Sequence, residues 1–473
     1  MKQPNILFIC SDEQSPRTVG CYGADFMRTP NIDRLARQGT LFENAYCAFP
    51  LCVPGRNALM TGQPCHKIKA YDIGSPLASD LPTWAHMLAR EGYRTPLYGK
   101  MHFLGADQLH GFDEHRHEMQ HGIGGFRWGE ETGNGNAYPM FTKIYFTDSL
   151  QLDGRMDYNF THDTGSRDSA VAFLDARKGD TAPFCLTVSF NYPHYPMVVD
   201  REVFESYAGA NIPPPVTGGW RHPRNDHMAD NVWGFNRMTG EETRIARQAY
   251  CAMGTMLDTW IGDVMAALDR SGHAENTIII YTTDHGDMWG EHGMWCKNCF
   301  YEDSARVPFI ISAPGLGIRS GDRISAPVSH LDLYPTLRDI IGANDWDVPL
   351  DGRSLWPVVT GKAPLDADRP VFSEYYACDV KGPERMVRWR QYKLNYYHNW
   401  GMEMFDLEKD PNELVNCIDE PVCQEVAGKL LRMLMEGWNP DQIEADIRVE
   451  QNRRTLIGES LRRQKAEAFE SGI

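Results

Sequence analysis

Short apolar runs recur along the chain, and each is followed by polar or charged residues. They cover residues 5–10, 184–190 and 277–281, and residues 95–98 form a shorter run of the same kind. An apolar run without alternation is typical of a strand that is buried on both faces of a sheet. We therefore predict four core strands at these positions.

Helical patterns lie between the predicted strands. Residues 29–39 and 83–91 begin with helix-start residues and stop at a glycine, and apolar residues recur at three- and four-residue steps over residues 241–270. Strands that alternate with helices form a largely parallel sheet with helices on both faces. The predicted fold class is α/β, with one large catalytic domain over residues 1–364.

The pattern changes in the last quarter of the chain. Residues 392–397 read as a strand of an antiparallel set, and residues 424–438 as an amphipathic helix. We predict a smaller α+β domain over residues 365–440 and a charged helical tail over residues 441–473.

Two stretches of the large domain show no clean periodicity. Residues 115–165 and 209–240 are rich in glycine, proline, asparagine, histidine and aromatic residues. We predict long loops there, and long loops in compact domains are often functional.

Side chains that could take part in catalysis or metal binding follow directly after the predicted core strands. In chain order they are Asp12 and Glu13, Lys100 and His102, His194, and Asp284 and His285. In a largely parallel sheet, ligands bind in the crevice beyond the carboxyl ends of the strands. These residues are far apart in the sequence, but we expect them to meet at one rim of the sheet.

The acidic members of this set suggest a metal site. Asp12, Glu13, Asp284 and His285 would give an oxygen-rich set with one imidazole, which suits Ca²⁺, Mg²⁺ or Mn²⁺. A single aspartate after a strand is more often a helix cap or a loop hydrogen bond. Two such acids at the ends of two core strands favour the metal site.

Cys52 is the candidate nucleophile. Residues 50–62 read as a loop that turns at Pro54 and Gly55 into a short helix ending near Gly62. A thiol at a helix start faces the partial positive charge of unpaired N–H groups, and Arg56 would point back at it from one turn on. A small buried hydrophobe is the commoner role of a lone cysteine, so both interpretations stay open at this point.

The spacing Cys52-x-Pro54-x-Arg56, followed by Thr61-Gly62, resembles the signature of the sulfatase family. Further family elements occur in the family's order: Gly99-Lys100-x-His102, His194 after residues 190–193, Asp284-His285, Lys297, and residues 405–411. The resemblance covers nearly the whole chain. It implies an alkaline-phosphatase-like fold, with a large mixed and mostly parallel sheet flanked by helices, and the hydrolysis of a sulfate monoester.

The resemblance also implies a modified residue, a metal and a set of roles. In this family the matching cysteine is converted to Cα-formylglycine by a formylglycine-generating enzyme, and a divalent cation, usually Ca²⁺, is bound. The implied metal ligands are Asp12, Glu13, the modified Cys52, Asp284 and His285, with Glu13 standing where many members carry Asp. The implied catalytic roles fall to Arg56 on the nucleophile, Lys100 and Lys297 on sulfate oxygens, His102 on the formylglycine hydrate, and His194 or Lys297 as the acid toward the leaving oxygen.

The family mechanism explains why an aldehyde is useful. The metal and Arg56 lower the pKa of one hydroxyl of the hydrate, which attacks sulfur. The second hydroxyl then loses its proton, the aldehyde forms again, and sulfate leaves by C–O cleavage.

The sequence leaves open which residues bind the leaving group of the substrate. Residues 79–83 and 99–112 resemble the choline sulfatases, and residues 451–463 do so weakly. A quaternary ammonium needs aromatic side chains and preferably a carboxylate, which Trp128 and Glu374 could supply. Loop packing and a salt bridge are the alternative roles. The substrate therefore stays open between choline sulfate, an aryl sulfate and a small sulfated sugar.

The composition of the chain limits the classes of binding partner that we expect. The net charge of −17 argues against nucleic acid or an anionic membrane, so an anionic substrate needs a local cluster of cations. No apolar stretch approaches the length of a membrane span. The twelve cysteines show no disulfide framework, and residues 1–4 lead straight into the first strand, so we expect a cytoplasmic protein. The charged tail leads us to expect a homo-oligomer.

Other functions fit parts of this pattern. A phosphonate monoester or phosphodiester hydrolase, or a broad arylsulfatase, would use the same scaffold and the same aldehyde. A non-catalytic binding protein is the remaining class, and it would have no need of a nucleophile, a metal site and an acid together.

Overall fold

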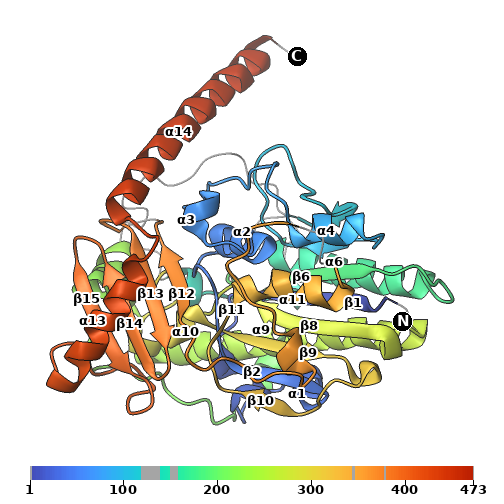
Figure 1. The fold of residues 1–473 in the computed structure, drawn as a ribbon, viewed down its shortest axis with the longest axis horizontal. Coiled ribbons are helices and arrows are strands. Elements are labelled where there is room, and N and C mark those ends of the chain that lie inside the picture. Colours follow the sequence, from blue (N-terminus) through green and yellow to red (C-terminus); the bar gives the residue numbers. More distant parts are fainter. Residues whose placement is uncertain (1–2, 119–138, 150–157, 344–346, 378–379, 472–473) are drawn as a thin grey trace.

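A nine-stranded sheet forms the centre of the molecule among the residues that the computed structural model describes, which are 3–118, 139–149, 158–343, 347–377 and 380–471 (Figure 1). Its strand order is β10-β2-β9-β8-β1-β6-β3-β4, and β11 pairs with β2. The strands are β1 (Asn5–Asp12), β2 (Gly39–Tyr46), β3 (Pro96–Gly99), β4 (Glu114–Arg116), β6 (Cys185–Pro193), β8 (Thr277–Thr283), β9 (Arg306–Ser312), β10 (Asp322–Ile324) and β11 (Val328–Ser329). A two-stranded sheet of β5 (Ile144–Phe146) and β7 (Met197–Val199) lies apart from it.

The sheet is mixed, with its parallel part in the middle. β1 runs parallel to β6 and β8, and β3 runs parallel to β6. β9 runs antiparallel to both β8 and β2. The four predicted strands are all in the parallel part. β2 and β9 were not predicted, because Glu43 and Asn44 interrupt the apolar run of β2 and Pro308 interrupts that of β9.

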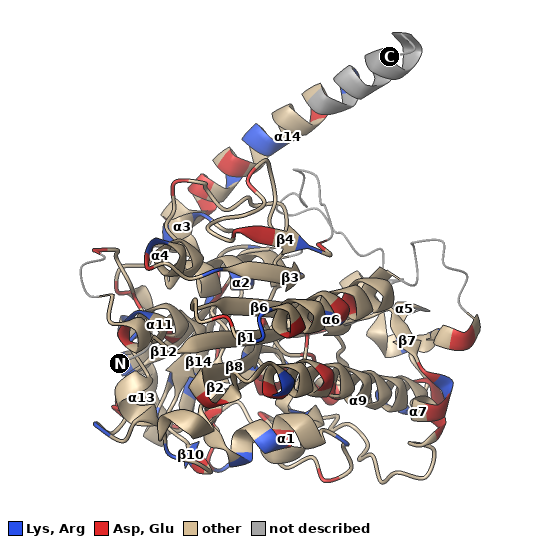
Figure 2. Ribbon diagram, turned by 90° about the vertical axis from the view of Figure 1, so that its right-hand side faces the viewer, with Lys and Arg blue, Asp and Glu red and all other residues tan. Residues whose placement is uncertain are grey.

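Helices cover both faces of this sheet (Figure 2). One face carries α1 (Pro30–Arg37), α6 (Tyr158–Ala176) and α9 (Gly240–Ser271), and the other carries α2 (Cys52–Thr61), α4 (Trp84–Arg90) and α11 (Leu333–Ile341). The remaining short helices are α3 (Cys65–Ile68), α5 (Pro139–Thr142), α7 (Arg201–Glu205), α8 (Pro223–Asp226), α10 (Glu302–Ala305) and α12 (Trp356–Val359).

The central strand β1 contributes to two hydrophobic cores. Leu7 and Ile9 pack in the core beneath α9, while Ile6 and Phe8 pack in the core beneath α4 and α11. Burying each such side chain stabilises the fold by about 1.5–3 kcal/mol. The uninterrupted apolar run therefore marks a strand covered from both sides, as predicted.

The long helix α9 closely matches its prediction. It begins with a capping box, in which the Thr239 hydroxyl accepts the N–H of Glu242 and the Glu242 carboxylate accepts the N–H of Thr239. It ends at Gly272, whose φ of 79° lies in the left-handed region that favours glycine.

A second, antiparallel sheet follows in the C-terminal part. Its order is β12 (Val371–Tyr375), β13 (Glu384–Trp389), β14 (Tyr392–Tyr397) and β15 (Gly401–Asp406), and α13 (Pro421–Met435) packs against it. The helix α14 (Pro440–Ser471) then leads away from the body (Figure 1). The fold class is thus as predicted, a mixed α/β sheet with a separate antiparallel sheet. None of the helices described here combines the length and the apolar character needed to cross a membrane.

The two predicted loops contain more regular structure than expected. The described part of residues 115–165 includes the first turns of α6, and residues 209–240 include α8 and a π-helix at His227–Trp233. Polar residues and Gly165 obscure the helical period of α6. This correction matters for the site, because α6 contacts the turn that carries His194.

Candidate active site

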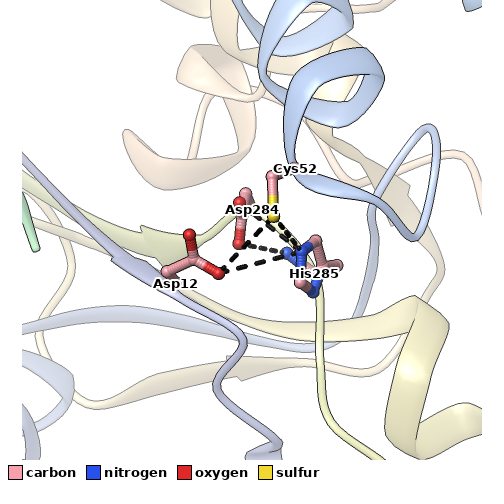
Figure 3. A group of neighbouring side chains, drawn as sticks. All are labelled: Asp12, Cys52, Asp284 and His285. Atoms are coloured by element: carbon pink, nitrogen blue, oxygen red, sulfur yellow. Dashed lines mark hydrogen bonds and ion pairs between the residues drawn. The ribbon is translucent and has the colours of Figure 1, made fainter. Parts of the chain in front are cut away.

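The side chains that follow the core strands meet at one rim, as the strand order requires. Asp12 ends β1, and Asp284 and His285 follow β8, the parallel neighbour of β1. Cys52 enters from the first residue of α2. Figure 3 shows these four side chains facing one another, and all of them are buried.

Cys52 sits among groups of both charges. Its Sγ lies 3.2 Å from His285 Nε2 and 3.8 Å from both Asp12 Oδ1 and Lys100 Nζ. Burial and the Asp12 charge raise the pKa of the Cys52 thiol to about 12, although Lys100 and Lys297 oppose them. An unmodified Cys52 is therefore a protonated thiol at neutral pH, and a weak nucleophile.

Gly55 lies in the first turn of α2, not at a turn before the helix as the sequence predicts, and it passes close to the preceding loop. A Cβ atom at this position would lie 2.7 Å from the carbonyl oxygen of Phe49, so the close approach requires glycine. At the other end, Gly62 closes α2 with a φ of 66°. The helix ends where predicted but begins earlier, at Cys52 itself instead of after Pro54 and Gly55.

Arg56 holds the two aspartates rather than pointing at Cys52. Its Nε donates to Asp284 Oδ2 at 2.8 Å, and its Nη2 donates to Asp12 Oδ2 at 3.3 Å. Its Nη1 donates to the carbonyl oxygen of Lys100 at 2.6 Å and to Ser189 Oγ at 2.9 Å. The planar, permanently charged guanidinium thus ties the ends of β1 and β8 together.

Four of these residues form a set that suits a metal ion. One ligand atom each of Asp12, Cys52, Asp284 and His285 lies within 4.8 Å of the other three. His285 Nδ1 lies 3.0 Å from the carbonyl oxygen of Gly286, which directs Nε2 toward the set. The buried Glu13 Oε1 accepts no hydrogen bond from the described residues. Two carboxylates, one imidazole and one spare carboxylate oxygen fit a hard divalent cation.

Glu13 also belongs to a second group on the same rim. Its Oε2 lies 2.7 Å from Lys297 Nζ and 3.0 Å from His194 Nε2, while its backbone N–H donates to Asp284 Oδ1. Burial raises the pKa of Glu13 to about 8, although Lys297 partly offsets it. The structure therefore places Glu13 between the metal set and the Lys297–His194 pair.

Lys297 and His194 are in direct contact, with 2.9 Å between Nζ and Nε2. Burial and the Lys297 charge hold the pKa of His194 well below its usual range. Burial opposes the charge of Lys297, but Glu13 raises the pKa of Lys297 well above its ordinary value. The proton of this pair therefore resides on Lys297.

Lys100 and His102 follow β3 on the same side. Burial opposes the charge of Lys100, but the contact with Asp12 raises its pKa above the usual range. His102 is buried and has a φ of 63°. The Glu118 carboxylate accepts the N–H of Met101 at 2.5 Å and that of His102 at 2.8 Å. Glu118, which sequence reasoning missed, fixes this left-handed turn.

Of the two residues predicted for the leaving group, the structure describes Glu374, and its contacts do not bring it to the cluster. Glu374 lies in β12, where it accepts from the N–H of His66 and pairs with His66 Nδ1 at 2.6 Å and Arg385 at 3.6 Å. It lines a separate cavity of about 320 Å³, whose described lining includes none of the residues around Cys52. Trp128 lies outside the described residues.

Two residues of α6 were also missed by sequence reasoning. Asn159 and Asp163 donate to and accept from the backbone of residues 191–195, the turn that carries His194. Their i, i+4 spacing places them on one helix face. That signal was available only to a reader who had recognised α6.

Comparison with known proteins agrees with this geometry. The family model described as Sulfatase matches residues 4–343, and the model described as N-sulphoglucosamine sulphohydrolase, C-terminal, matches residues 290–439. The choline-sulfatase of Rhizobium meliloti is 34% identical over 97% of this chain and 92% of its own length. The arylsulfatase K of Gallus gallus is 28% identical over 92% of this chain and 82% of its own.

The fold also resembles solved structures. The phosphonate monoester hydrolase SpPMH from Silicibacter pomeroyi superposes with a TM-score of 0.73 at 24% identity, covering 92% of this chain and 95% of its own. This likeness concerns the fold alone.

Proposed function

This chain belongs to the sulfatase family and is a sulfuric ester hydrolase, and we propose that it hydrolyses a small organic sulfate monoester through a modified Cys52. One observation carries the proposal. Cys52 Sγ lies within 3.8 Å of a carboxylate, an imidazole and a lysine at the carboxyl ends of the central strands. That is the place where an α/β sheet binds its ligand.

The proposed nucleophile is Cα-formylglycine, made from Cys52 by a formylglycine-generating enzyme. The hydrated aldehyde would supply the hydroxyl that accepts the sulfuryl group and the second hydroxyl that later expels sulfate. The raised pKa of the unmodified thiol supports this role for a modified residue.

We propose that Asp12, Asp284 and His285 hold the divalent cation, with Glu13 Oε1 and residue 52 as further ligands. Ca²⁺ is the first choice because the donor set is rich in oxygen, and Mn²⁺ and Mg²⁺ are the alternatives. The cation would supply positive charge to the sulfate and to the nucleophile. Arg56, which pairs with both Asp12 and Asp284, would help to fix the spacing of these two ligands.

The remaining residues bind sulfate and move one proton. Lys100 and Lys297 would contact sulfate oxygens from two sides of residue 52, and His102 would orient the nucleophile. The Lys297–His194 pair would deliver a proton to the leaving oxygen, since Lys297 Nζ carries it and His194 Nε2 lies 2.9 Å away. Preorganised contacts of this kind are each worth on the order of 10²–10³ in rate.

The substrate class is proposed from the relatives. The resemblance to a choline-sulfatase over nearly the whole chain makes choline sulfate the first candidate, with aryl sulfates and small sulfated sugars behind it. Trp128 remains a proposed contact for the leaving group. We propose that Glu374 acts instead as the partner of His66 and Arg385.

Phosphonate monoester hydrolysis is the second candidate, because a phosphonate monoester hydrolase shares the fold. The test is a panel of sulfate esters and one aryl phosphonate, assayed with protein produced together with a formylglycine-generating enzyme. We expect turnover of sulfate esters and a peptide mass at residue 52 that corresponds to the aldehyde. Conversion of Cys52 with faster cleavage of the phosphonate would favour the second candidate. No conversion and no turnover would favour a binding protein.

We also propose a cytoplasmic homo-oligomer in which α14 contacts a second subunit. Near its middle α14 is anchored by Arg454, which binds Asp72 through two nitrogens, while Leu456 and Ile457 beyond it are exposed. Replacing both by Ser keeps the anchor and should reduce the assembly to monomers in a sizing experiment. An unchanged assembly would contradict the role of α14.

A further inference from the structure

We propose that Asn159 and Asp163 of α6 are positioning residues for His194, and that they set the direction in which its imidazole meets Lys297 and the leaving group. The proposal rests on the proposed function, because it assigns to His194 a share in proton delivery. It is carried by contacts that connect α6 to both ends of the turn at residues 191–195.

Asp163 holds the beginning of this turn. Its side chain is fully buried and accepts three N–H groups: the backbone N–H of Asn191 at 2.7 Å, that of Tyr192 at 2.8 Å, and the Asn191 side-chain amide at 2.9 Å. A buried carboxylate is stable only with such donors, and the donors in turn lose their acceptor if it is removed. Asp163 therefore fixes where β6 stops and the turn begins.

Asn159 holds the end of the turn, one helical turn earlier on α6. Its Nδ2 donates to the carbonyl oxygens of His194 and Tyr195, both at 3.1 Å. The carbonyl of Tyr195 is also the partner of His194 Nδ1, at 2.6 Å. Asn159 thus fixes the very oxygen that orients the imidazole.

The orientation decides which nitrogen is chemically available. A carbonyl oxygen only accepts, so His194 Nδ1 must donate, and Nε2 then carries the lone pair. Nε2 is the atom that lies 2.9 Å from Lys297 Nζ and 3.0 Å from Glu13 Oε2. If the turn were loose, the ring could rotate and the Lys297–His194 contact would be lost.

The chain offers a matched control for Asp163. Asp258 of α9 is also buried and also accepts two successive backbone N–H groups, of Asn31 and Ile32, and the side-chain amide of Asn31. It holds the start of α1 instead of a catalytic turn. Asp163→Asn and Asp258→Asn therefore each remove a buried carboxylate that accepts backbone N–H groups, one at the turn of His194 and the other at the start of α1.

The test compares two esters on the mature enzyme. 4-Nitrophenyl sulfate has a leaving group that needs little protonation, and an alkyl sulfate has one that needs it fully. General acid catalysis contributes about 10²–10⁴, so we expect Asp163→Asn and Asn159→Ala to lower kcat for the alkyl ester by about 10–100-fold and for the aryl ester by less than about 3-fold. Asp258→Asn should change both esters by the same factor.

A double-mutant cycle separates positioning from stability. In a His194→Ala background, Asp163→Asn and Asn159→Ala should have no further effect on the alkyl ester, because they act through the imidazole. Equal losses on both esters, as in Asp258→Asn, or full additivity with His194→Ala would overturn the proposal.

The proposal can also be tested without turnover. ¹⁵N NMR of the His194 ring should show the Nδ1–H tautomer in the wild type and a mixture of tautomers in Asn159→Ala. An unchanged tautomer in the folded variant would refute the role of Asn159. Failure of the proposed function is seen separately, since the wild type itself would then hydrolyse no sulfate ester.

Discussion

A comparison of two buried charge clusters among the described residues shows what makes one of them a site. The first surrounds Cys52 at the strand ends. The second lies between the two sheets, where Lys393 of β14 contacts Glu302 at 2.9 Å, Glu413, and the carbonyl oxygen of Phe300 at 2.6 Å. Tyr46 of β2 adds a hydrogen bond to Glu302.

The second cluster joins strand residues of both sheets to Glu302 of α10 and to the loop residues Phe300 and Glu413. Each of the three Lys393 donors has an acceptor, and Arg388 of β13 donates to the Tyr46 hydroxyl. The first cluster comes from strand ends and turns, with Glu13 and His102 both at a φ of 63°. It also surrounds Cys52, the nucleophile of our proposal once it is modified. Burial of charges alone does not reveal function, whereas burial at strand ends around a nucleophile does.

Loss of the nucleophile should give the largest effect and fall only on the first cluster. Cys52→Ala should lower kcat/KM on the order of 10⁴-fold or more, as removal of a covalent nucleophile does. The melting temperature should change little. Cys47→Ala is the matched control, since Cys47 is equally buried nearby. Comparable activity of both variants would contradict the assignment of Cys52.

Loss of one charge from the second cluster should affect stability instead. Lys393→Met leaves Glu302 and Glu413 without their buried partner, which costs about 3–5 kcal/mol of unfolding free energy. Urea denaturation measures it, and kcat per folded molecule should stay the same. If Lys393→Met were as stable as the wild type, the comparison between the clusters would fail.

Lys297→Ala also removes one buried lysine charge, but from the cluster around Cys52. We expect a loss on the order of 10²–10³ in kcat/KM for sulfate esters, because one preorganised cation is removed. The activity loss should exceed the stability loss, in contrast to Lys393→Met. A variant that unfolds readily but retains its rate would place Lys297 with the structural cations.

A smaller effect is expected on the pH dependence of the unfolding free energy, through His115, which pairs with Glu118 next to the first cluster. His115 directs Nδ1 to the carbonyl oxygen of Gln108 at 2.8 Å and Nε2 to that of Gly99 at 3.1 Å, and it pairs with Glu118. Both nitrogens face acceptors, so the charged imidazolium satisfies them best. Burial opposes the charge, but Glu118 raises the pKa of His115 above its ordinary value.

The sign of this effect follows from the raised pKa. The stabilisation is fully present below the unfolded pKa of about 6.5 and is lost as the pH rises through the folded pKa. Unfolding free energy should therefore fall above pH 6.5 by about 0.5–1.5 kcal/mol, the usual worth of one hydrogen bond. His115→Gln should remove this component from the stability profile. A pH dependence unchanged in that variant would count against it.

The sequence allowed prediction of those parts whose physics is local. The run Ile6–Ile9 predicts a strand covered on both faces. A polar residue after such a run, as at Asp12 or Asp284, predicts a side chain at the rim of the sheet. Cys52 was identified by its spacing to Pro54 and Arg56, and the family comparison agrees with that resemblance.

The missed parts depend on contacts between distant segments. α6 carries few apolar residues in register because one side of it serves the turn at residues 191–195, so Asp163 looked like a loop residue. The role of Glu118 depends on backbone N–H groups sixteen and seventeen residues earlier, which no side-chain pattern encodes. Arg56 was expected to face the thiol, and only the observed ends of β1 and β8 show why it binds both aspartates.

The exposure of Cys52, only 2%, has a consequence for the order of events in the cell. A modifying enzyme cannot reach a side chain that is enclosed by a finished sheet and its helices. The conversion of residue 52 that we propose must therefore precede the closing of the fold around it. Under this proposal a chain that folds before conversion would keep its unmodified thiol, so the rate of folding and the supply of the maturation enzyme would together set the fraction of modified protein.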